Sequence, residues 1–344
     1  MRALFVIEAG YAFGMGHLLR CRPLILHFSK KQAKIDIWVR GSPNILEGRS
    51  WPSLMKTFHS SEDVPPDNVI DEITRHLERE HYDWTILDGY GLTNQNPYSR
   101  LTASGSRLLT LDDTGEHPLH TDILLNQNTE DPALYRDQTN PECRLLLGPR
   151  YALIDRQFLA KRRSSTPTDK LKRILISFGG VDRKNRTTRI LDLLDKIKEP
   201  LSLDVVLGTY YPFDDQNLSC KTSHPIQFHR NVACLAPLMS KADLMISAGG
   251  STIWQACCMG VPLLALQTVD NQEKVIGTLI EHRAALCLDV SNTDHHEAGV
   301  AETLFLDRFK RLMNPHLRNE LSTNAKKLVD GKGVNRVAAM LENQ

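Results

Sequence analysis

The amino-acid sequence predicts an α/β protein of two domains, each with a mostly parallel β-sheet covered by helices. Three observations lead to this prediction. Short apolar or β-branched segments alternate with longer amphipathic ones, the pattern of successive βαβ units. Each half of the chain begins with an apolar run that leads into glycines, at residues 3–16 and again at 174–180. The length of 344 residues suits two domains of ordinary size.

The first half of the chain supplies the elements of the first domain. Apolar or β-branched runs predict strands at residues 3–7, 35–39, 85–87, 107–111 and 123–125. Amphipathic periodicity predicts helices at residues 17–31 and 68–80, with a shorter one at 98–104.

A polar, basic stretch at residues 161–170 separates the two halves. It has no apolar periodicity and is typical of an interdomain linker, the alternative being a long surface loop within one domain. We therefore expect an N-terminal domain at residues 1–160, a linker at 161–171 and a C-terminal domain at 172–344. The C-terminal helices of the chain are able to pack back on the N-terminal domain.

The alternation of strands and helices starts again after the linker. Strands are expected at residues 173–178, 202–207, 244–247, 263–266 and 285–288. Helices are expected at residues 187–196, 235–240, 253–259, 273–281 and 302–313. The tail, residues 315–341, is predicted to be helical on both sides of a turn at Asp330-Gly331-Lys332-Gly333.

Composition and charge argue against several functional classes. The 42 Lys and Arg balance 41 Asp and Glu, so no global basic field is present to attract nucleic acid. No apolar stretch approaches the roughly 18 residues that span a bilayer, and the first apolar run is too short for a signal peptide and meets Glu8 at once. The seven cysteines are scattered and lack a Cys-x-x-Cys pair, which favours reduced thiols. We expect a cytoplasmic protein that binds neither nucleic acid nor membranes.

The segment Gly14-Met15-Gly16-His17 is the most informative part of the first half. It follows the first expected strand and opens the first expected helix. Glycines permit a sharp turn and a close approach to a ligand, and amides at a helix N-terminus accept anions. Such a turn would place His17, a proton-transfer group, at the carboxyl edge of a parallel sheet. A tight turn with a surface histidine is the alternative.

A second glycine turn, Ala248-Gly249-Gly250-Ser251-Thr252, joins an expected strand to an expected helix. Its amides and two hydroxyls, at the positive end of the helix dipole, are suited to a pyrophosphate. A plain N-cap role for Ser251 is the alternative. Gln255 would lie one helical turn later on the same face and could bond a ribose hydroxyl, the alternative being an ordinary surface glutamine.

A third turn, Ser177-Phe178-Gly179-Gly180, repeats the step from strand to glycine. By itself it indicates only another βα unit. Asp182 and Asn185 follow it, and we expect them to cap the next helix.

Other chemistries lack the residues that they need. Neighbouring acids such as Asp112 and Asp113 tend to point in different directions, so they do not form the facing carboxylates of a glycosidase. The sequence contains no His-Glu-x-x-His, no Gly-x-Ser-x-Gly and no Asp-x-Asp. His117 and His120 have no further ligands at suitable spacing, so we expect no metal site.

Seven motifs in order resemble those of a single family. They are Gly14-x-Gly16-His17-x-x-Arg20-Cys21, Leu87-Asp88-Gly89-Tyr90-Gly91, Leu111-Asp112-Asp113, Asp122-Ile123-Leu124-Leu125-Asn126-Gln127-Asn128, Gly148-Pro149-Arg150-Tyr151-Ala152-Leu153, Ser177-Phe178-Gly179-Gly180-x-Asp182 and Ala248-Gly249-Gly250-Ser251-Thr252-x-Trp254-Gln255, followed by Asn271-Gln272. The chain thereby resembles the hydrolases of pseudaminic acid biosynthesis, which remove UDP from a nucleotide-linked diacetamido sugar. This family is similar in fold to the GT-B glycosyltransferases.

The resemblance implies a GT-B-like α/β fold, with two Rossmann-like domains facing across a central cleft that holds the sugar nucleotide. It implies hydrolysis of UDP-2,4-diacetamido-2,4,6-trideoxy-β-L-altrose by attack of water at the anomeric carbon, with C–O cleavage, inversion and no metal or cofactor. His17 would be the general base, because histidine exchanges protons near neutral pH. UDP is a good leaving group, so no general acid is implied.

The family's binding residues carry over by position. The sugar-binding residues that the resemblance implies are Gly14, Gly16, Tyr90, Asn126 and Asn271. The UDP-binding residues that it implies are Gly179, Gly180, Val232, Gly250, Ser251, Thr252 and Gln255.

The chain departs from the family pattern at Glu8-Ala9-Gly10, where the family commonly has Asp-Ala-Ser, and at Gln255, where it usually has Glu. Because Gln can still accept a ribose hydroxyl, we expect altered affinity there, while the change at Gly10 leaves the exact sugar open. Two other functions stay open: a GT-B glycosyltransferase in which His17 deprotonates an acceptor hydroxyl, and a non-catalytic UDP-sugar-binding protein. We expect a monomer whose partners are a UDP-linked diacetamido sugar and water.

Overall fold

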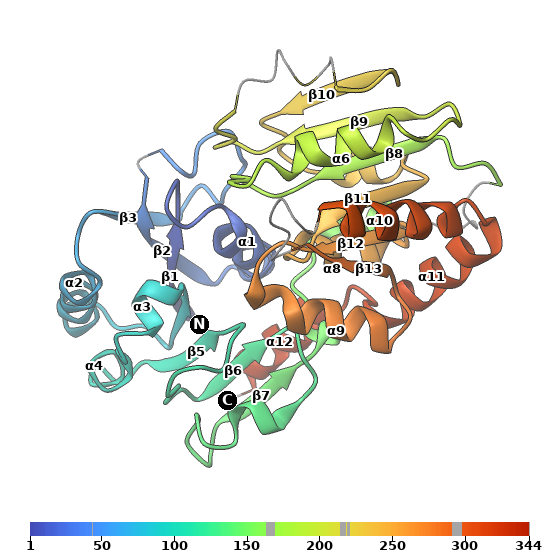
Figure 1. Ribbon diagram of the computed structural model, residues 1–344. Helices are drawn as coiled ribbons and strands as arrows, with labels where there is room; N and C mark the ends of the chain where they lie inside the picture. Colours follow the sequence, from blue (N-terminus) through green and yellow to red (C-terminus); the bar gives the residue numbers. More distant parts are fainter. Residues whose placement is uncertain (43, 163–168, 214–217, 219–220, 291–297, 344) are drawn as a thin grey trace. The chain divides into compact units, whose positions relative to one another are not determined.

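The computed structural model describes residues 1–42, 44–162, 169–213, 218, 221–290 and 298–343. The chain divides into two compact units, which are drawn in Figure 1. Unit 1 comprises Met1–Leu153 and Gly331–Gln344, and unit 2 comprises Ile154–Asp330. Residues 163–168, most of the expected linker, lie outside the described residues.

Unit 1 contains a seven-stranded sheet in which every neighbouring pair is parallel. The strand order is β3-β2-β1-β4-β5-β6-β7. The strands are β1 (Arg2–Ala9), β2 (Lys34–Gly41), β3 (Lys56–Ser61), β4 (Trp84–Asp88), β5 (Arg107–Leu111), β6 (Ile123–Asn126) and β7 (Arg144–Leu147). The order reverses between β1 and β4, and ligands of such sheets bind at this point, beyond the carboxyl ends of the strands.

The helices of unit 1 come from both ends of the chain. They are α1 (Gly16–Lys30), α2 (Pro66–Arg79), α3 (Tyr90–Thr93), α4 (Tyr98–Thr102), the 3₁₀ turns η1 (Pro132–Tyr135) and η2 (Pro149–Tyr151), and α12 (Gly333–Glu342). The indole nitrogen of Trp84 in β4 donates to the carbonyl of Leu341, and Lys31 forms an ion pair with Glu342. These contacts hold the last helix of the chain on unit 1.

Unit 2 contains a six-stranded parallel sheet in the order β10-β9-β8-β11-β12-β13. Its strands are β8 (Arg173–Ser177), β9 (Ser202–Leu207), β10 (Ile226–Arg230), β11 (Leu244–Ala248), β12 (Leu263–Gln267) and β13 (Leu286–Asp289). Its helices are α5 (Arg156–Ala160), α6 (Arg186–Leu194), α7 (Ala236–Met239), α8 (Thr252–Met259), η4 (Asp270–Gln272), α9 (Glu273–Glu281), α10 (Ala298–Leu312) and α11 (Pro315–Leu328). The strand order reverses between β8 and β11.

Burial explains which elements the sequence predicts. Strands inside each sheet are covered on both faces and therefore contain continuous apolar runs, as in β1, where residues 3–7 are all apolar and buried. Every expected strand and helix has a counterpart whose ends differ by at most a few residues. The sequence pattern does not predict β3, β7 and β10. All three lie at sheet edges. β3 and β10 carry polar side chains at exposed positions, so they form no apolar run, and the apolar part of β7 is only three leucines long.

Candidate active site

The glycine turns of the sequence lie at the reversal points of the two sheets. In unit 1, the loop after β1 leads into α1, and β4, the neighbour of β1, ends at Asp88. In unit 2, Gly179 and Gly180 follow β8, and Gly249 and Gly250 follow β11. Each sheet therefore carries its candidate residues where a parallel α/β sheet binds ligands.

The loop before His17 is a narrow turn closed by glycines. Gly10 and Gly14 exchange two backbone hydrogen bonds of 2.9 and 2.7 Å, and Gly14 has a φ of +74°, which favours glycine. A Cβ atom added to Gly14 or to Gly16 would meet nothing within 4 Å. Both glycines thus border open space beside the first turn of α1.

His17 is held by a carboxylate at the end of the neighbouring strand. Its Nδ1 atom lies 2.6 Å from Oδ1 of Asp88, a side chain with no exposed surface. Because ionised Asp88 only accepts, this contact needs the proton on Nδ1, and Nη2 of Arg20, 3.2 Å from the same nitrogen, donates to Asp88 instead. Among the described residues, Nε2 of His17 has no hydrogen-bond partner. The ring is therefore oriented with Nε2 as its basic nitrogen, the arrangement of a carboxylate-supported general base.

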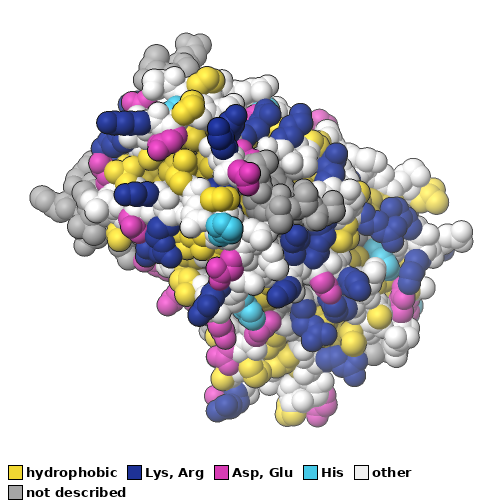
Figure 2. Space-filling model, turned by 90° about the vertical axis from the view of Figure 1, so that its right-hand side faces the viewer, with side chains coloured by type: hydrophobic (Ala, Val, Ile, Leu, Met, Phe, Trp, Pro, Cys, Tyr) yellow, Lys and Arg dark blue, Asp and Glu magenta, His cyan; other side chains and the backbone are white. Residues whose placement is uncertain are grey.

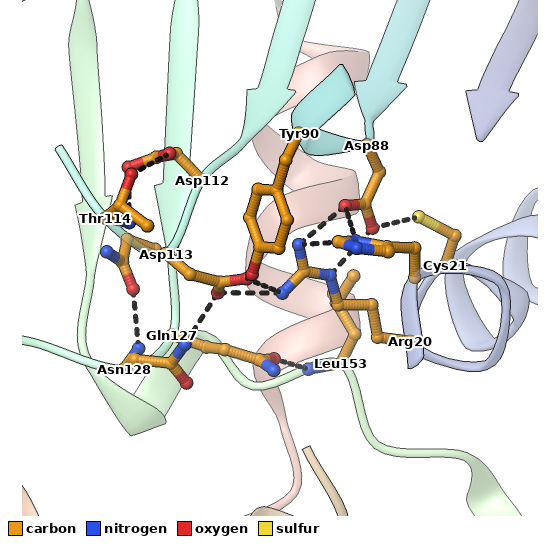
Figure 3. Close-up of polar contacts among 12 residues, drawn as sticks. Arg20, Cys21, Asp88, Tyr90, Asp112, Asp113, Thr114, Gln127, Asn128 and Leu153 are labelled. Carbon is orange, nitrogen blue, oxygen red and sulfur yellow. Dashed lines mark hydrogen bonds and ion pairs between the residues drawn. The ribbon is translucent and has the colours of Figure 1, made fainter. Parts of the chain in front are cut away.

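Arg20, one helical turn after His17, connects this pair to a second carboxylate (Figure 3). Its Nε and Nη2 atoms donate to Asp88 at 2.7 and 2.6 Å. Its Nη1 atom donates to both oxygens of Asp113 at 2.8 and 2.7 Å. One guanidinium therefore bonds two carboxylates, and all three side chains are buried.

The charges of this cluster fix its protonation. Burial alone would raise the pKa of Asp88, but the charges of Arg20 and His17 and their hydrogen bonds lower it well below its ordinary value. Burial would likewise lower the pKa of Arg20, and the charges of Asp113 and Asp88 raise it well above its ordinary value. Asp88 is therefore ionised throughout the neutral range and able to stabilise a positive charge on His17.

Tyr90 packs directly against the imidazole. Its ring meets that of His17 edge-on, with centroids 4.8 Å apart, and its hydroxyl donates to Asp113 at 2.5 Å. Burial and then the charge of Asp113 raise the pKa of Tyr90 well above its ordinary value. The residue is consequently a neutral phenol that contacts the base with its ring.

Asn126 lies deeper, at the end of β6. Its amide nitrogen donates to the hydroxyl of Tyr135 at 2.6 Å, and its oxygen accepts from the backbone of Asn128 at 2.8 Å. The side chain of Asn128 in turn donates to Asp113 at 2.6 Å. Asn126 has no exposed surface. Through these hydrogen bonds it holds Asn128, which in turn holds Asp113. The direct sugar contact implied for it stays a prediction.

The neighbouring acids Asp112 and Asp113 serve different partners, as expected. Asp112 accepts from the backbone of Thr114 and Gly115 and from the hydroxyl of Tyr135, while Asp113 faces Arg20. Figure 3 shows the two carboxylates pointing apart. They do not form a pair of facing carboxylates.

In unit 2, the turn of residues 248–252, called here the Ser251 turn, has polar groups that are not used by the neighbouring residues that the structure describes. Ser251 is the N-cap residue of α8, but its side chain makes no capping hydrogen bond, so a plain capping role does not account for it. Within the described part of the chain, the amides of Ser251 and Thr252 have no acceptor. A Cβ atom at Gly250 would meet nothing within 4 Å. Free amides beside open space at a helix N-terminus suit an anion.

The remaining unit 2 candidates lie on the surface. Gln255 and Val232 are partly exposed and Asn271 is exposed. Asn271 follows β12 in η4, and its neighbour Gln272 packs close to Gly249 of the Ser251 turn. The structure thus brings the Asn271 turn beside the Ser251 turn.

The Gly179-Gly180 turn is shaped by its neighbours. Gly179 has a φ of +82°, and a Cβ atom there would meet nothing within 4 Å. A Cβ atom at Gly208, after β9, would lie 2.3 Å from the carbonyl oxygen of Gly179. Asp182 accepts from the backbone of Arg186, and Asn185 from that of Thr188, which confirms that both cap α6.

The sequence pattern did not single out Asp88, Arg20 and Asp113, the residues that contact His17 or one another in the candidate site. All three stand in the motifs quoted above, yet spacing alone gives them no role. A signal was present: each Asp follows an apolar strand, and Arg20 falls three residues after His17 on the same helical face.

Charged side chains of both signs lie on the face drawn in Figure 2. Figure 2 shows Lys and Arg side chains interspersed with Asp and Glu side chains over the visible face. Among the described residues, no group of three or more His, Cys, Asp or Glu side chains is placed to hold a metal ion. In that same part of the chain, no helix combines the length and apolar character needed to cross a membrane.

Comparison with known proteins finds similarity along most of the chain. Spore coat polysaccharide biosynthesis protein SpsG of Bacillus subtilis is 25% identical over 343 residues, 98% of this chain and 96% of that protein. The UDP-2,4-diacetamido-2,4,6-trideoxy-beta-L-altropyranose hydrolase of Campylobacter jejuni is 26% identical over 280 residues, 79% of this chain and 94% of that protein. An uncharacterized protein of Methanocaldococcus jannaschii is 24% identical over 80% of this chain, which spans 57% of its length. The resemblance drawn from the motifs is confirmed.

Solved structures agree on the fold. MurG of Acinetobacter baumannii superposes with a TM-score of 0.68 at 14% identity, with 100% of both chains covered. The UDP-GlcNAc 2-epimerase of Neisseria meningitidis, bound to UDP-GlcNAc, has a TM-score of 0.62 at 15% identity, again over 100% of both chains. No protein-family model matches the chain. The predicted GT-B-like class with two Rossmann-like domains is confirmed.

Proposed function

We propose that this protein hydrolyses a UDP-linked 2,4-diacetamido-2,4,6-trideoxy sugar, the β-L-altrose derivative of pseudaminic acid biosynthesis, to UDP and the free sugar. The observation that carries the proposal is His17, bound through Nδ1 to the ionised Asp88 and basic at Nε2. The similarity to the Campylobacter jejuni hydrolase supports the choice of substrate.

His17 would act as the general base. Its Nε2 atom removes a proton from water while the water oxygen bonds to the anomeric carbon. The bond between that carbon and the phosphate oxygen breaks, and its electron pair leaves with UDP. Asp88 stabilises the imidazolium that forms, and Arg20 keeps Asp88 ionised.

Unit 2 would bind the leaving group. The free amides of Ser251 and Thr252, with their hydroxyls, would accept the pyrophosphate oxygens and stabilise the charge that develops on them. Gly250 and the Gly179-Gly180 turn would leave room for the phosphates. Gln255 would bond the ribose, and the segment of Val232 would contact the uracil.

Unit 1 would bind the sugar. The open space beside Gly14 and Gly16 would accept the ring, and Tyr90 would form one wall of this space. Asn271 of unit 2 would contact an acetamido group. Asn126, which is enclosed, would act through the neighbours that it holds.

A product analysis tests the proposal. Wild-type protein is incubated with a small panel of UDP-linked diacetamido sugars in the presence of EDTA, and NMR identifies the products. We expect free sugar of inverted anomeric configuration together with UDP. A sugar found on an added acceptor would instead indicate transfer, and stoichiometric binding without turnover would indicate a binding protein.

A further inference from the structure

A second buried ion pair lies at the carboxyl edge of the unit 1 sheet, outside the His17 cluster. Glu8 of β1 and Arg40 of β2 are paired in register, and Oε1 of Glu8 lies 2.6 Å from Nη1 of Arg40. Their side chains are only 1% and 8% exposed. Burying two charges is not in itself stabilising, because apolar residues of similar size often serve a core as well. A contribution to stability therefore does not by itself explain why this charged pair is buried here.

Arg40 holds the loop that leads to His17. Its Nη2 atom donates to the backbone carbonyls of Glu62 and Val64 at 3.0 and 2.9 Å, which fixes the segment after β3. Its guanidinium lies 5.0 Å from the centre of the Phe13 ring, in the loop before α1. The carboxylate of Glu62 also accepts from the backbone of Ala12 in that loop.

Glu8 holds the turn that carries Tyr90. Its Oε2 atom accepts a 2.7 Å hydrogen bond from the backbone of Gly91. A Cβ atom at Gly89 would lie 2.6 Å from this carboxylate oxygen, and one at Gly91 would lie 2.5 Å from the other. The two glycines beside Tyr90 are therefore what lets its backbone rest against Glu8.

We propose that the Glu8–Arg40 pair positions two segments for the reaction. It holds the loop before His17 (residues 10–16) and the turn around Tyr90 (residues 89–91) at a fixed distance from each other. Neither residue touches the reacting atoms in this account. Each acts through a neighbour: Arg40 through Phe13, and Glu8 through the backbone on both sides of Tyr90. The catalytic part of this inference rests on the proposed hydrolysis.

The substitution Glu8→Gln removes the charge of the pair while keeping the size of the side chain. We expect kcat for UDP release to fall about tenfold or more, because a small displacement of a catalytic group is costly. The dissociation constant for UDP, measured by calorimetry, should not change, since the proposed UDP site is in unit 2. Hydrogen–deuterium exchange should rise in peptides covering residues 10–17 and 89–93.

Asp36→Asn is the matched control. Asp36 forms an ion pair with Arg2 across the same two strands, but at the opposite end of the sheet. This variant should lose stability and keep both wild-type kcat and wild-type exchange at residues 10–17 and 89–93. If Asp36→Asn lowered kcat as much as Glu8→Gln does, the pair would be merely structural and the proposal would be overturned.

Gly91→Ala provides a second variant that keeps both charges. Its added Cβ would push directly on the Glu8 carboxylate, so we expect the same loss of kcat and the same rise in exchange. Wild-type kcat and exchange in both Glu8→Gln and Gly91→Ala would contradict the proposal. If wild-type protein released no UDP from any sugar of the panel, the proposed function would fail, whereas the exchange comparison would still decide whether the pair holds the two loops.

Discussion

Nδ1 of His17 and Oδ1 of Asp88 lie 2.6 Å apart, although the two residues are 71 positions apart in the sequence. The contact exists because β1 and β4 are neighbours in a parallel sheet. Helix α1, which follows β1, therefore begins beside the carboxyl end of β4. The sheet topology thus supplies the carboxylate that orients the imidazole.

The substitution Asp88→Asn should abolish most of the activity. The amide is uncharged and leaves the orientation and charge of the imidazole unsupported, so we expect kcat to fall by about 10²- to 10⁴-fold. Binding of UDP should persist. Steady-state kinetics and calorimetry check both expectations. Asp83→Asn, just before β4 begins, is the control and should keep wild-type kcat.

Asp88 should make the free energy of unfolding fall as the pH is lowered into the acid range. The pKa of this carboxyl is lower in the folded state than in the unfolded state, where it is near 3.9, so the unfolded chain takes up the proton first. The contribution of Asp88 is therefore complete above about pH 5 and is lost progressively as pH falls from there toward the much lower pKa of the folded state. Urea unfolding of wild type and Asp88→Asn should give free energies whose difference is constant near neutral pH and narrows as pH falls from about 5 to 3. A constant difference across this range would contradict the assignment.

Arg20→Met should destabilise unit 1 strongly. The substitution leaves Asp88 and Asp113 buried without their shared cation, and breaking a buried ion pair from one side costs on the order of 3–5 kcal/mol. Chemical denaturation measures the loss. Arg100→Met is the control, since Arg100 forms ion pairs with the exposed Asp67 and Asp71 and should cost about 1 kcal/mol or less. Equal losses would argue against a tightly coupled cluster around Arg20.

Gly250→Ala should weaken nucleotide binding without disturbing the fold. The new methyl group would occupy the open space beside the free amides of α8, so we expect the dissociation constant of UDP to rise about tenfold, or roughly 1.4 kcal/mol. Gly277→Ala is a close match, because a Cβ atom there also meets nothing within 4 Å and the residue lies in helix α9 of the same unit. That control should bind UDP as wild type does. Unchanged binding in Gly250→Ala would remove the proposed phosphate site from this turn.

The fold could be predicted from the sequence because central parallel strands are buried on both faces. Runs such as those of β1 and β8 are continuously apolar and therefore visible without any structure. The edge strand β3, with the sequence KTFHSS, carries no such signal. Its place depends on pairing with β2, and no local pattern encodes that pairing.

The candidate site could be predicted only in part. Glycine turns and His17 stand out because their chemistry is local. The roles of Asp88, Asp113 and Arg20 depend on contacts between residues 68 to 93 positions apart, which arise from strand order. The burial of Asn126 also depends on tertiary packing, so a motif position alone could not separate a ligand contact from a supporting residue.

The most direct test of the whole account is turnover by His17→Asn with the UDP-linked diacetamido sugar that the wild type hydrolyses. His27→Asn, later in the same helix α1, is the control. We expect His17→Asn to bind UDP with wild-type affinity but to hydrolyse the UDP-sugar at least about 10²-fold more slowly, while His27→Asn keeps wild-type turnover. Wild-type turnover by His17→Asn would show that another group activates the water and would contradict the role of His17 as the general base.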